Sequence, residues 1–475
     1  MSGKSQRIRD PLHDLITFEG PQVSQLEGSL WQVLQSRPFQ RLRRIKQLGF
    51  SEFVYPGATH TRFAHSVGVF HTARTLMEIV RRRASSRQDT RENHALAAAL
   101  LHDVGHGPFS HAFEKVGKRL GLKLAHHEAF SEELIRKGEI AEILNREMGT
   151  CFSDDVADIL KKDGVTKVHH AVVSSQFDAD RLDYIRRDRF MAGSQHAGID
   201  FRWLISNLEI AEVPRGVDDQ PLGNIETFVI GPKAVYAAEA FVLGLFQLYP
   251  TVYFHKATRC AERIFEELLV RVFHLVHDNG FERTGLPKNH PLIRFGLNPS
   301  SAASALELDD TVIWGGLSMM TEAEDLAVSS LARRLRDRSL LKCVDIRTAV
   351  AREIDPQSSN SDPLVESIDR CCAAIREKLT ERYSADKNTG VCSVLFDEDE
   401  RSPYKGVDRS KGPLDRINVQ VEGGSGVVDL AERSSVVKAL KSFKLSRAYI
   451  ERENPDLQVE VNNLIREEIE KCRKI

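Results

Sequence analysis

Apolar residues recur at helical spacing along most of the chain. In one stripe, Phe63, Val67 and Phe70 fall three or four residues apart, which predicts a helix over 60–83. His65 lies beside this stripe, at the edge of the expected buried face. The same periodicity predicts helices over 26–47, with an interruption at Arg37-Pro38, and over 94–103, 127–146, 153–161, 234–248, 250–278, 322–338 and 361–383. The chain is therefore expected to be mainly α-helical.

Patterns typical of strands are few. An alternation of apolar and polar residues at 225–231 predicts one strand. The opening segment 7–18 is expected to be extended, because Pro11 disfavours helix at the residue before it. Two further short strands are predicted at 391–396 and 417–421, and 436–449 is interpreted as an amphipathic helix or a helix–strand pair.

Composition shifts to Asn, Gly, Pro and Ser around 279–310, as is typical of a loop. We therefore place a boundary near residue 285. The expected organisation is a helical core at 1–285 and a smaller α+β lobe at 286–475, with a regulatory or oligomerisation role.

The overall charge gives no sign of a nucleic-acid-binding protein. The 475 residues carry a formal net charge of −2, with 28% charged and 41% hydrophobic residues, as in an ordinary globular protein. No global positive field favours nucleic acid, and Arg81-Arg82-Arg83 is interpreted as a solvated helix face.

Several absences favour a cytoplasmic protein that does not span a membrane. The seven cysteines show no CxxC spacing, which favours reduced thiols. Residues 1–7 lack the apolar core of a signal peptide. The apolar run 240–249 is shorter than the roughly 18–20 residues that a membrane span needs, so we interpret it as a buried helix.

Three histidines and an aspartate lie within the short stretch 101–111. The segment before it, 93–100, is apolar nearly all round, as in a buried helix, and should carry His102 and Asp103 into the interior. A buried His-Asp pair is costly unless it is hydrogen-bonded or binds a metal. Gly105 is expected to help end the helix just after this pair.

A metal site would combine this pair with residues from two other predicted helices. Asp180, Tyr184 and Asp188 fall on one helical stripe that is expected to line a pocket. Taken singly, His65 would be a hydrogen-bonded core histidine, and Asp180 a surface ion pair with Arg181 or Arg187. Imidazole and carboxylate together suit Mn, Fe, Ni or Zn, and a site with fewer than four protein ligands leaves room for water. We predict a site made of His65, His102, Asp103 and Asp180.

The chain resembles the HD-domain deoxynucleoside triphosphate triphosphohydrolases, in the branch that contains the vertebrate SAM-and-HD-domain enzyme. No SAM domain is expected before the catalytic part. The resemblance runs through most of 8–280 and continues faintly to about 450. Its matching segments are Asp10–His13, Arg37–Gly49, Tyr55–Ser66, Leu101–His111, His127-Glu128, Asp178–Asp188 and Tyr253–Lys256. It implies an HD-domain helical phosphohydrolase core with the smaller α+β lobe.

The resemblance also implies a reaction. One divalent metal ion per active site (Fe, Mn, Ni, Zn or Mg) would activate a water that attacks the α-phosphorus of a dNTP, giving deoxynucleoside and tripolyphosphate. Further Mg²⁺ is expected to accompany the nucleotide phosphates. His127 corresponds to the general acid, and His106 and His111 to histidines beside the metal and the phosphates. Glu114 stands where the family has a catalytic aspartate.

Other matching positions imply contacts with the substrate. Arg62 and Arg181 correspond to residues that hold the triphosphate, although lysine is commoner at the latter position. Gln47 and Asp188 correspond to groups that read the sugar 3′-hydroxyl, and Tyr184 to a ring that leaves no room for a 2′-hydroxyl. Leu48, Tyr253 and His255 also lie in matching segments and are expected to line this pocket.

Regulation is expected to differ from that of the vertebrate enzyme. Gln35 replaces the acidic residue that reads guanine in its activator site, and 243–249 lacks a phosphate-holding arginine. An anion site for another nucleotide activator is predicted between the subunits of a homo-oligomer, a dimer or tetramer, at Arg43, Lys233 and Lys256.

Two other functions stay open. One is an HD phosphohydrolase that acts on a ribonucleotide or a signalling nucleotide. The other is a nucleic-acid-binding HD protein that keeps only the metal site, which the neutral charge disfavours.

Overall fold

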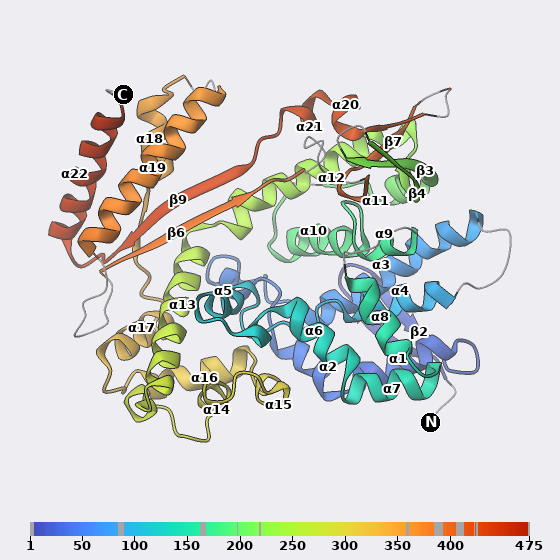
Figure 1. Cartoon of the computed structure of the whole chain (residues 1–475), viewed down its shortest axis with the longest axis horizontal. Helices are drawn as coiled ribbons and strands as arrows, with labels where there is room; N and C mark the ends of the chain where they lie inside the picture. Colours follow the sequence, from blue (N-terminus) through green and yellow to red (C-terminus); the bar gives the residue numbers. More distant parts are fainter. Residues whose placement is uncertain are drawn as a thin grey trace. The chain divides into compact units, whose positions relative to one another are not determined.

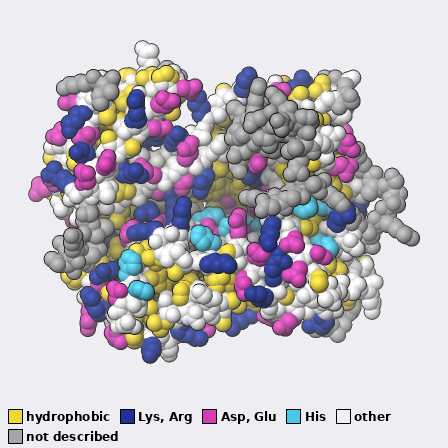
Figure 2. Space-filling model, in the orientation of Figure 1, with side chains coloured by type: hydrophobic (Ala, Val, Ile, Leu, Met, Phe, Trp, Pro, Cys, Tyr) yellow, Lys and Arg dark blue, Asp and Glu magenta, His cyan; other side chains and the backbone are white. Residues whose placement is uncertain are grey.

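The computed structural model covers the whole chain, and it describes residues 4–83, 90–161, 168–196, 198–217, 220–357, 361–383, 393–404, 413–421, 423 and 426–473. The protein is mainly helical, as the sequence predicted, and the described residues also form three small sheets (Figure 1). On the face seen in Figure 2, acidic and basic side chains of the described residues are interspersed, in keeping with the nearly neutral composition.

The chain forms two compact units whose segments alternate along the sequence. Unit 1 comprises Met1–Val252, Pro299–Thr311 and Ser402–Lys441, and unit 2 comprises Tyr253–Asn298, Val312–Arg401 and Ser442–Ile475. The expected boundary near residue 285 therefore lies inside a segment of unit 2. The physical reason is that α13 (Lys256–His277) packs on α14 (Pro291–Leu297) and α17 (Leu326–Arg336), so the intervening Pro- and Gly-rich stretch is a turn within one core.

Unit 1 begins with a hairpin of β1 (Gln6–Asp10) and β2 (Asp14–Phe18), which confirms the extended opening. The helix expected over 26–47 is divided into α1 (Gln25–Gln35) and α2 (Arg37–Arg41). The division lies at Ser36, whose extended backbone (ψ 150°) precedes a proline at the start of α2.

Five helices of unit 1 carry the residues of interest. They are α3 (Arg62–Arg83), α4 (Thr90–Leu101), α5 (His111–Leu120), α6 (His127–Arg136) and α10 (Ala179–Met191). Helix α3 packs between α4 and α10. As predicted, α4 is apolar nearly all round and fully buried from Ala95 to Leu101, because no polar face needs water. The helix ends just before His102, so the His-Asp pair begins the following turn in the interior of unit 1.

The rest of unit 1 covers these helices. It contains α7 (Glu139–Met148), α8 (Phe152–Leu160), α9 (Val168–Val173), α11 (Phe201–Ser206), α12 (Val235–Leu248), α15 (Ala302–Ala305), α20 (Leu430–Arg433) and α21 (Ser435–Ala439). A four-stranded sheet has the order β3 (Leu208–Val217), β4 (Gln220–Ile230), β7 (Asn418–Gln420) and β8 (Val427–Asp429). Only β4 and β7 run parallel. The sequence predicted β4 and β7 and missed β3, whose Pro214 and Gly216 obscure the alternation.

Unit 2 contains a long antiparallel sheet with the order β5 (Lys342–Asp345), β9 (Phe443–Ile450) and β6 (Val394–Arg401). Its apolar core lies under α18 (Ile346–Ile354), α19 (Asp362–Tyr383) and α22 (Pro455–Cys472), which lie side by side in Figure 1. Helix α19 confirms the prediction over 361–383, and α21 followed by β9 is the predicted helix–strand pair. Two residues of the expected strand 391–396, at 391 and 392, lie outside the described residues.

One segment, Pro232–Tyr253, is long and apolar enough by length and composition to cross a membrane, and 44% of its most apolar window is buried. A core helix of a folded protein meets the same criterion. Inside unit 1, the side chains of Ala238, Phe241, Val242 and Leu248 on α12 are buried, which supports the interpretation as a core helix.

Candidate active site

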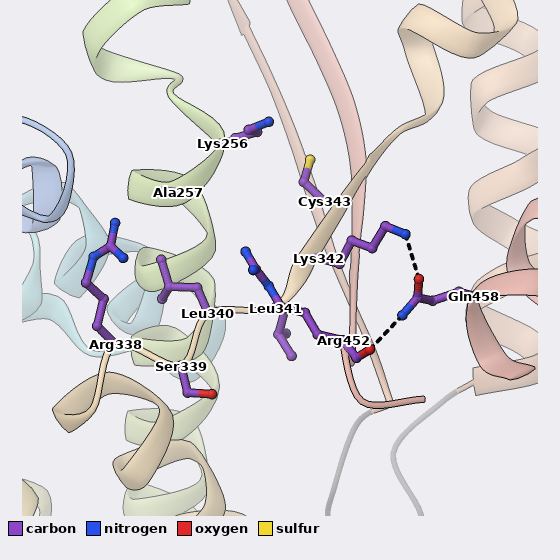
Figure 3. Close-up of a pocket in the computed structure, with 10 residues that line it drawn as sticks. All are labelled: Lys256, Ala257, Arg338, Ser339, Leu340, Leu341, Lys342, Cys343, Arg452 and Gln458. Atoms are coloured by element: carbon purple, nitrogen blue, oxygen red, sulfur yellow. Dashed lines mark hydrogen bonds between the residues drawn. The ribbon is translucent and has the colours of Figure 1, made fainter. Parts of the chain in front are cut away.

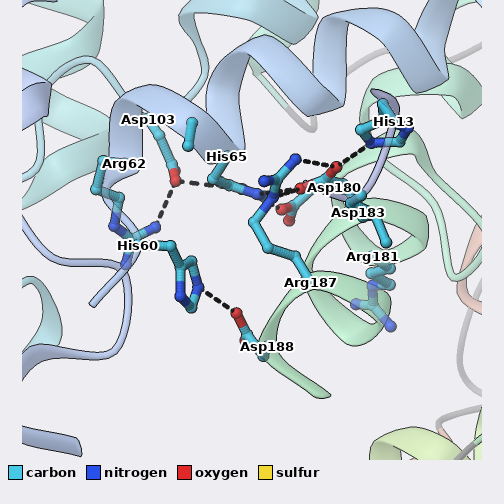
Figure 4. Close-up of polar contacts among 12 residues, drawn as sticks. His13, His60, Arg62, His65, Asp103, Asp180, Arg181, Asp183, Arg187 and Asp188 are labelled. Carbon is cyan, nitrogen blue, oxygen red and sulfur yellow. Dashed lines mark hydrogen bonds and ion pairs between the residues drawn. The ribbon is translucent and has the colours of Figure 1, made fainter. Parts of the chain in front are cut away.

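Two histidines and two carboxylates from three segments converge in unit 1. Figure 4 shows three of them, His65, Asp103 and Asp180. His65 comes from α3, His102 and Asp103 from the turn after α4, and Asp180 from the first turn of α10. Asp180 Oδ1 lies 3.0 Å from His65 Nε2 and 3.6 Å from His102 Nε2. The Asp103 carboxylate lies 3.6 Å from His65 Nε2 and 3.3 Å from His102 Nε2. The structure therefore brings together the four residues that the sequence predicted as metal ligands.

The two imidazoles fit a metal ion. Both Nε2 atoms are buried, and among the described residues neither has a hydrogen-bond partner, because the nearby carboxylates lie at ion-pair distance without hydrogen-bond geometry. Leaving two buried ring nitrogens without a partner is costly, and a bound cation removes the cost. Ligand atoms of His65, His102 and Asp103 all lie within 4.8 Å of one another. This donor set suits Mn, Fe, Ni or Zn.

The electrostatics of the site also favour a cation. Burial lowers the pKa of His65, but the carboxylates of Asp180 and Asp183 outweigh burial and raise it to about 10. The pKa of Asp180 is lowered by the two histidines, against the effect of burial. The surroundings thus hold positive charge strongly. A metal ion would take the place of a proton, since imidazole ligates in its neutral form.

The remaining ring nitrogens fix which atoms face the centre. His65 Nδ1 donates to Asp183 Oδ2 at 2.9 Å, and His102 Nδ1 donates to the Ala99 carbonyl at 2.9 Å. With Nδ1 carrying the hydrogen, each Nε2 offers its lone pair to the metal. Sequence reasoning gave Asp183 no role. The available signal was its place one helical turn after Asp180 on α10.

Asp183 belongs to a fully buried network. Its carboxylate accepts bonds from His13 Nε2 at 2.6 Å and from Arg187 Nε at 2.8 Å. Arg187 continues to Asp10 Oδ2 at 2.7 Å, which ties the N-terminal hairpin to α10. Arg187 therefore does not form the surface ion pair with Asp180 that was considered for the isolated sequence. It holds the carboxylate that orients a predicted metal ligand.

The predicted catalytic residues lie beside the metal centre. His106 Nε2 lies 3.3 Å from Asp103 Oδ1, and the His106 ring stacks on His127 with 4.1 Å between centroids. Glu114 accepts a hydrogen bond from His111 Nδ1 at 2.8 Å and a short one from His127 Nδ1. Burial lowers the pKa of His127, but the Glu114 carboxylate outweighs it and raises the pKa above its usual value. The longer glutamate thus still reaches the predicted general acid.

The predicted substrate residues of unit 1 surround the same centre. Arg62 is buried, contacts Asp103 through Nη1 and donates from Nε to Ser110 Oγ at 3.0 Å. His60 links Gln47 to Asp188 by hydrogen bonds. The Nε2 of His60 donates to Asp188 Oδ1 at 2.9 Å, and the His60 carbonyl accepts from the backbone amide of Gln47 at 3.0 Å. The predictions had given His60 no role. Leu48 is half-buried, and the side chain of Arg181 contacts that of Gln176. Burial raises the pKa of Tyr184, so the Tyr184 phenol stays neutral.

Comparison with known proteins places this site in a family. A model described as the HD domain matches residues 62–184, a range that includes all four predicted metal ligands. YwfO of Bacillus subtilis, an uncharacterized protein, is 34% identical over 338 residues that cover 71% of each chain. The chain belongs to the HD-domain phosphohydrolases.

Other relatives of this HD-domain protein agree with that assignment. A phosphohydrolase of Bacteroides thetaiotaomicron has the same fold, with a TM-score of 0.70, 27% identity, and coverage of 94% of this chain and 100% of that one. The deoxynucleoside triphosphate triphosphohydrolase SAMHD1 of Gallus gallus is 31% identical over 237 residues, which cover 43% of this chain and 37% of that one. The HD-domain match, together with the cluster of His65, His102 and Asp103, supports a metal-dependent hydrolase. Most of the chicken protein lies outside the match.

The remaining predicted residues of the HD protein are spread over both units. Tyr253 and His255 belong to unit 2, where His255 caps α13 by accepting from the Ala257 amide at 3.2 Å. Arg43 and Lys233 lie exposed in unit 1, and the Arg43 guanidinium lies 3.5 Å from the centre of the Phe63 ring. Lys256 is the first residue of α13 in unit 2. The roles of these residues stay predictions.

Proposed function

We propose that the protein hydrolyses deoxynucleoside triphosphates to deoxynucleoside and tripolyphosphate. The observation that carries this proposal is the pair of buried Nε2 atoms, on His65 and His102, that face two carboxylates without a hydrogen-bond partner. A cation held there supplies Lewis acidity, which activates water and neutralises charge on the phosphate. The similarity to the deoxynucleoside triphosphate triphosphohydrolase SAMHD1 supports the choice of substrate.

The protein's own residues would handle the proton and the phosphate charge. The Glu114 carboxylate keeps His127 protonated, so that its imidazolium donates a proton to the leaving 5′-oxygen. Arg62, already buried beside Asp103, presents a guanidinium that forks onto phosphate oxygens. The stacked His106 limits the movement of the His127 ring.

Selection of deoxyribose would rest on Gln47, Asp188 and Tyr184. The Oε1 atom of Gln47 is buried without a hydrogen-bond partner among the described residues, which suits a ligand hydroxyl. Asp188 is linked to Gln47 by His60, which bonds to both residues. The neutral Tyr184 ring offers a flat surface to a sugar. A ribonucleotide or signalling nucleotide is the alternative substrate if this edge accepts a 2′-hydroxyl.

The test is a product assay with purified protein and Mn²⁺ or Fe²⁺. A panel of dNTPs, NTPs and single-stranded DNA would be incubated with the protein, with Asp103→Ala as the inactive control. We expect tripolyphosphate from dNTPs and little product from NTPs. Orthophosphate or a nucleoside monophosphate as product would contradict the proposed reaction, and equal cleavage of NTPs would favour the alternative substrate.

Activation by a nucleotide is also proposed. Of the three residues predicted for the activator site, Lys256 lines a basic pocket of unit 2, whereas Arg43 and Lys233 do not (Figure 3). The pocket has a volume of about 670 Å³. Four of its ten lining residues are basic and none of the ten is acidic, which favours phosphate groups. The basic residues are Lys256, Arg338, Lys342 and Arg452. Assays with and without GTP or dATP, combined with light scattering, would test activation and the proposed dimer or tetramer together.

The pH profile should report the bond between Glu114 and His127. Because the carboxylate raises the pKa of His127, activity should persist above the usual histidine range and fall as pH rises through the raised pKa. In Glu114→Gln the pKa of His127 should drop, so the alkaline limb of kcat should move to lower pH. Glu128→Gln, which changes an exposed carboxylate next to His127 in sequence, is the matched control. An unmoved limb in Glu114→Gln would exclude His127 as the acid.

A further inference from the structure

A buried aspartate outside the HD domain joins two backbone segments next to the site. Asp310, 2% exposed, comes from the segment Pro299–Thr311 that returns to unit 1 late in the sequence. Its Oδ1 accepts a hydrogen bond from the Phe109 amide at 2.7 Å, and its Oδ2 accepts one from the Lys46 amide at 2.9 Å. One side chain therefore connects the turn after α4 to the segment that carries Gln47.

The turn that Asp310 holds has an unfavourable backbone. Phe109 and Ser110 are consecutive non-glycine residues with φ of 53° and 55°, in the left-handed region that L-residues seldom adopt. Such a conformation persists only when its surroundings determine it. Ser110 Oγ donates to the Lys46 carbonyl at 3.1 Å, and the Phe109 ring stacks on Phe50 with 4.0 Å between centroids. Together with Asp310, these contacts fix the turn from several sides.

The two joined segments carry predicted substrate residues. His111 follows the turn directly as the first residue of α5. On the other side, Lys46 precedes Gln47, and the Arg62 amide donates to the Ile45 carbonyl at 2.9 Å. A shift between the two segments would therefore change the spacing of His111, Gln47 and Arg62.

We propose that Asp310 is a positioning residue, which holds His111 at the correct distance from Gln47 and Arg62 through the Phe109 and Lys46 amides. Both of its oxygens bind backbone amides, so it contributes geometry rather than acid–base chemistry. The catalytic part of this inference rests on the proposed function. The structural part does not.

The test compares Asp310→Asn with wild type. Asparagine keeps the shape and one acceptor but turns an NH₂ group toward the second amide, so one of the two bonds is lost. We expect unchanged metal content and a fall in kcat/KM of roughly 100-fold, as for a displaced catalytic group. Discrimination between dNTPs and their 2′,3′-dideoxy analogues should weaken, because Gln47 is predicted to read the 3′-hydroxyl.

The neighbouring carboxylate gives a matched control. Asp309 is similarly buried, at 3%, but binds Arg44 Nε at 2.6 Å and the Thr311 amide at 3.0 Å. Asp309→Asn should keep the wild-type kcat/KM and the discrimination. Equal losses in both variants, or wild-type kinetics in Asp310→Asn, would overturn the inference.

Hydrogen–deuterium exchange separates this inference from the proposed reaction, because it needs no substrate. The amides of Phe109 and Lys46 should exchange faster in Asp310→Asn and at the wild-type rate in Asp309→Asn. Unchanged exchange in Asp310→Asn would overturn the inference even if dNTPs are cleaved. Faster exchange in a protein that cleaves no dNTP would support the positioning contact and reject the proposed function alone.

Discussion

Asp103→Ala is expected to lose its divalent metal and to hydrolyse dNTPs roughly a thousandfold more slowly or not at all, because a catalytic cation stabilises the transition state by several kcal/mol. The carboxylate faces both imidazoles of the centre and also contacts Arg62. Metal content measured by mass spectrometry and tripolyphosphate release would be compared with wild type. Full metal occupancy with full activity would remove Asp103 from the site.

A second variant separates metal loss from damage to the fold. Removing Asp103 leaves the buried Arg62 without its carboxylate, which itself destabilises the protein. His65→Ala removes a predicted ligand without touching Arg62. Both variants should lose the metal. The melting temperature should fall in both, and further in Asp103→Ala, which leaves a buried charge unpaired, than in His65→Ala, which opens a buried cavity.

Asp183→Asn is expected to weaken both the fold and the metal site. Asparagine carries no charge for the buried Arg187, so the free energy of unfolding should fall by about 3 kcal/mol. It also accepts the His65 Nδ1 hydrogen less strongly, so metal affinity should fall roughly 10- to 100-fold. Chemical denaturation and metal titration would measure the two effects separately.

Asp10→Asn is the matched control for this variant. It removes the other carboxylate of Arg187, but it lies two contacts further from His65 than Asp183 does, because Arg187 stands between the two carboxylates. Its unfolding free energy should also fall, while its metal affinity should stay near that of wild type. An equal loss of affinity in the two variants would mean that the network acts through general stability rather than through the orientation of His65.

Local sequence patterns predicted the helices and the convergence of the metal residues. The burial of α4 follows from residues within that segment, as does the shared face of Asp180 and Asp188 on α10. The helix was expected to continue to Asp103, and it ends at Leu101 instead. Helical periodicity reports burial, and burial of His65 and Asp103 already requires a partner. These features need no knowledge of distant contacts.

The hydrogen-bond partners of the buried carboxylates could not be predicted from local sequence patterns. His13 meets Asp183 across 170 positions of sequence, and Asp310 meets Phe109 across 201. Nothing in the local pattern of Asp10, Asp183 or Asp310 distinguishes a buried, charge-paired carboxylate from a solvated one. The same limit explains the boundary near 285, since composition marks turns and cannot say which segments later pack together.

The parallel pairing of Val229 with Asn418 has a consequence for synthesis on the ribosome. At about 5–20 residues per second, the strand that ends at Ile230 waits roughly 10 to 40 seconds for its partner to be translated. During that time its apolar edge is open to pairing with another nascent chain. A chaperone that shields this edge until residue 418 has been translated should therefore raise the yield of correctly folded protein.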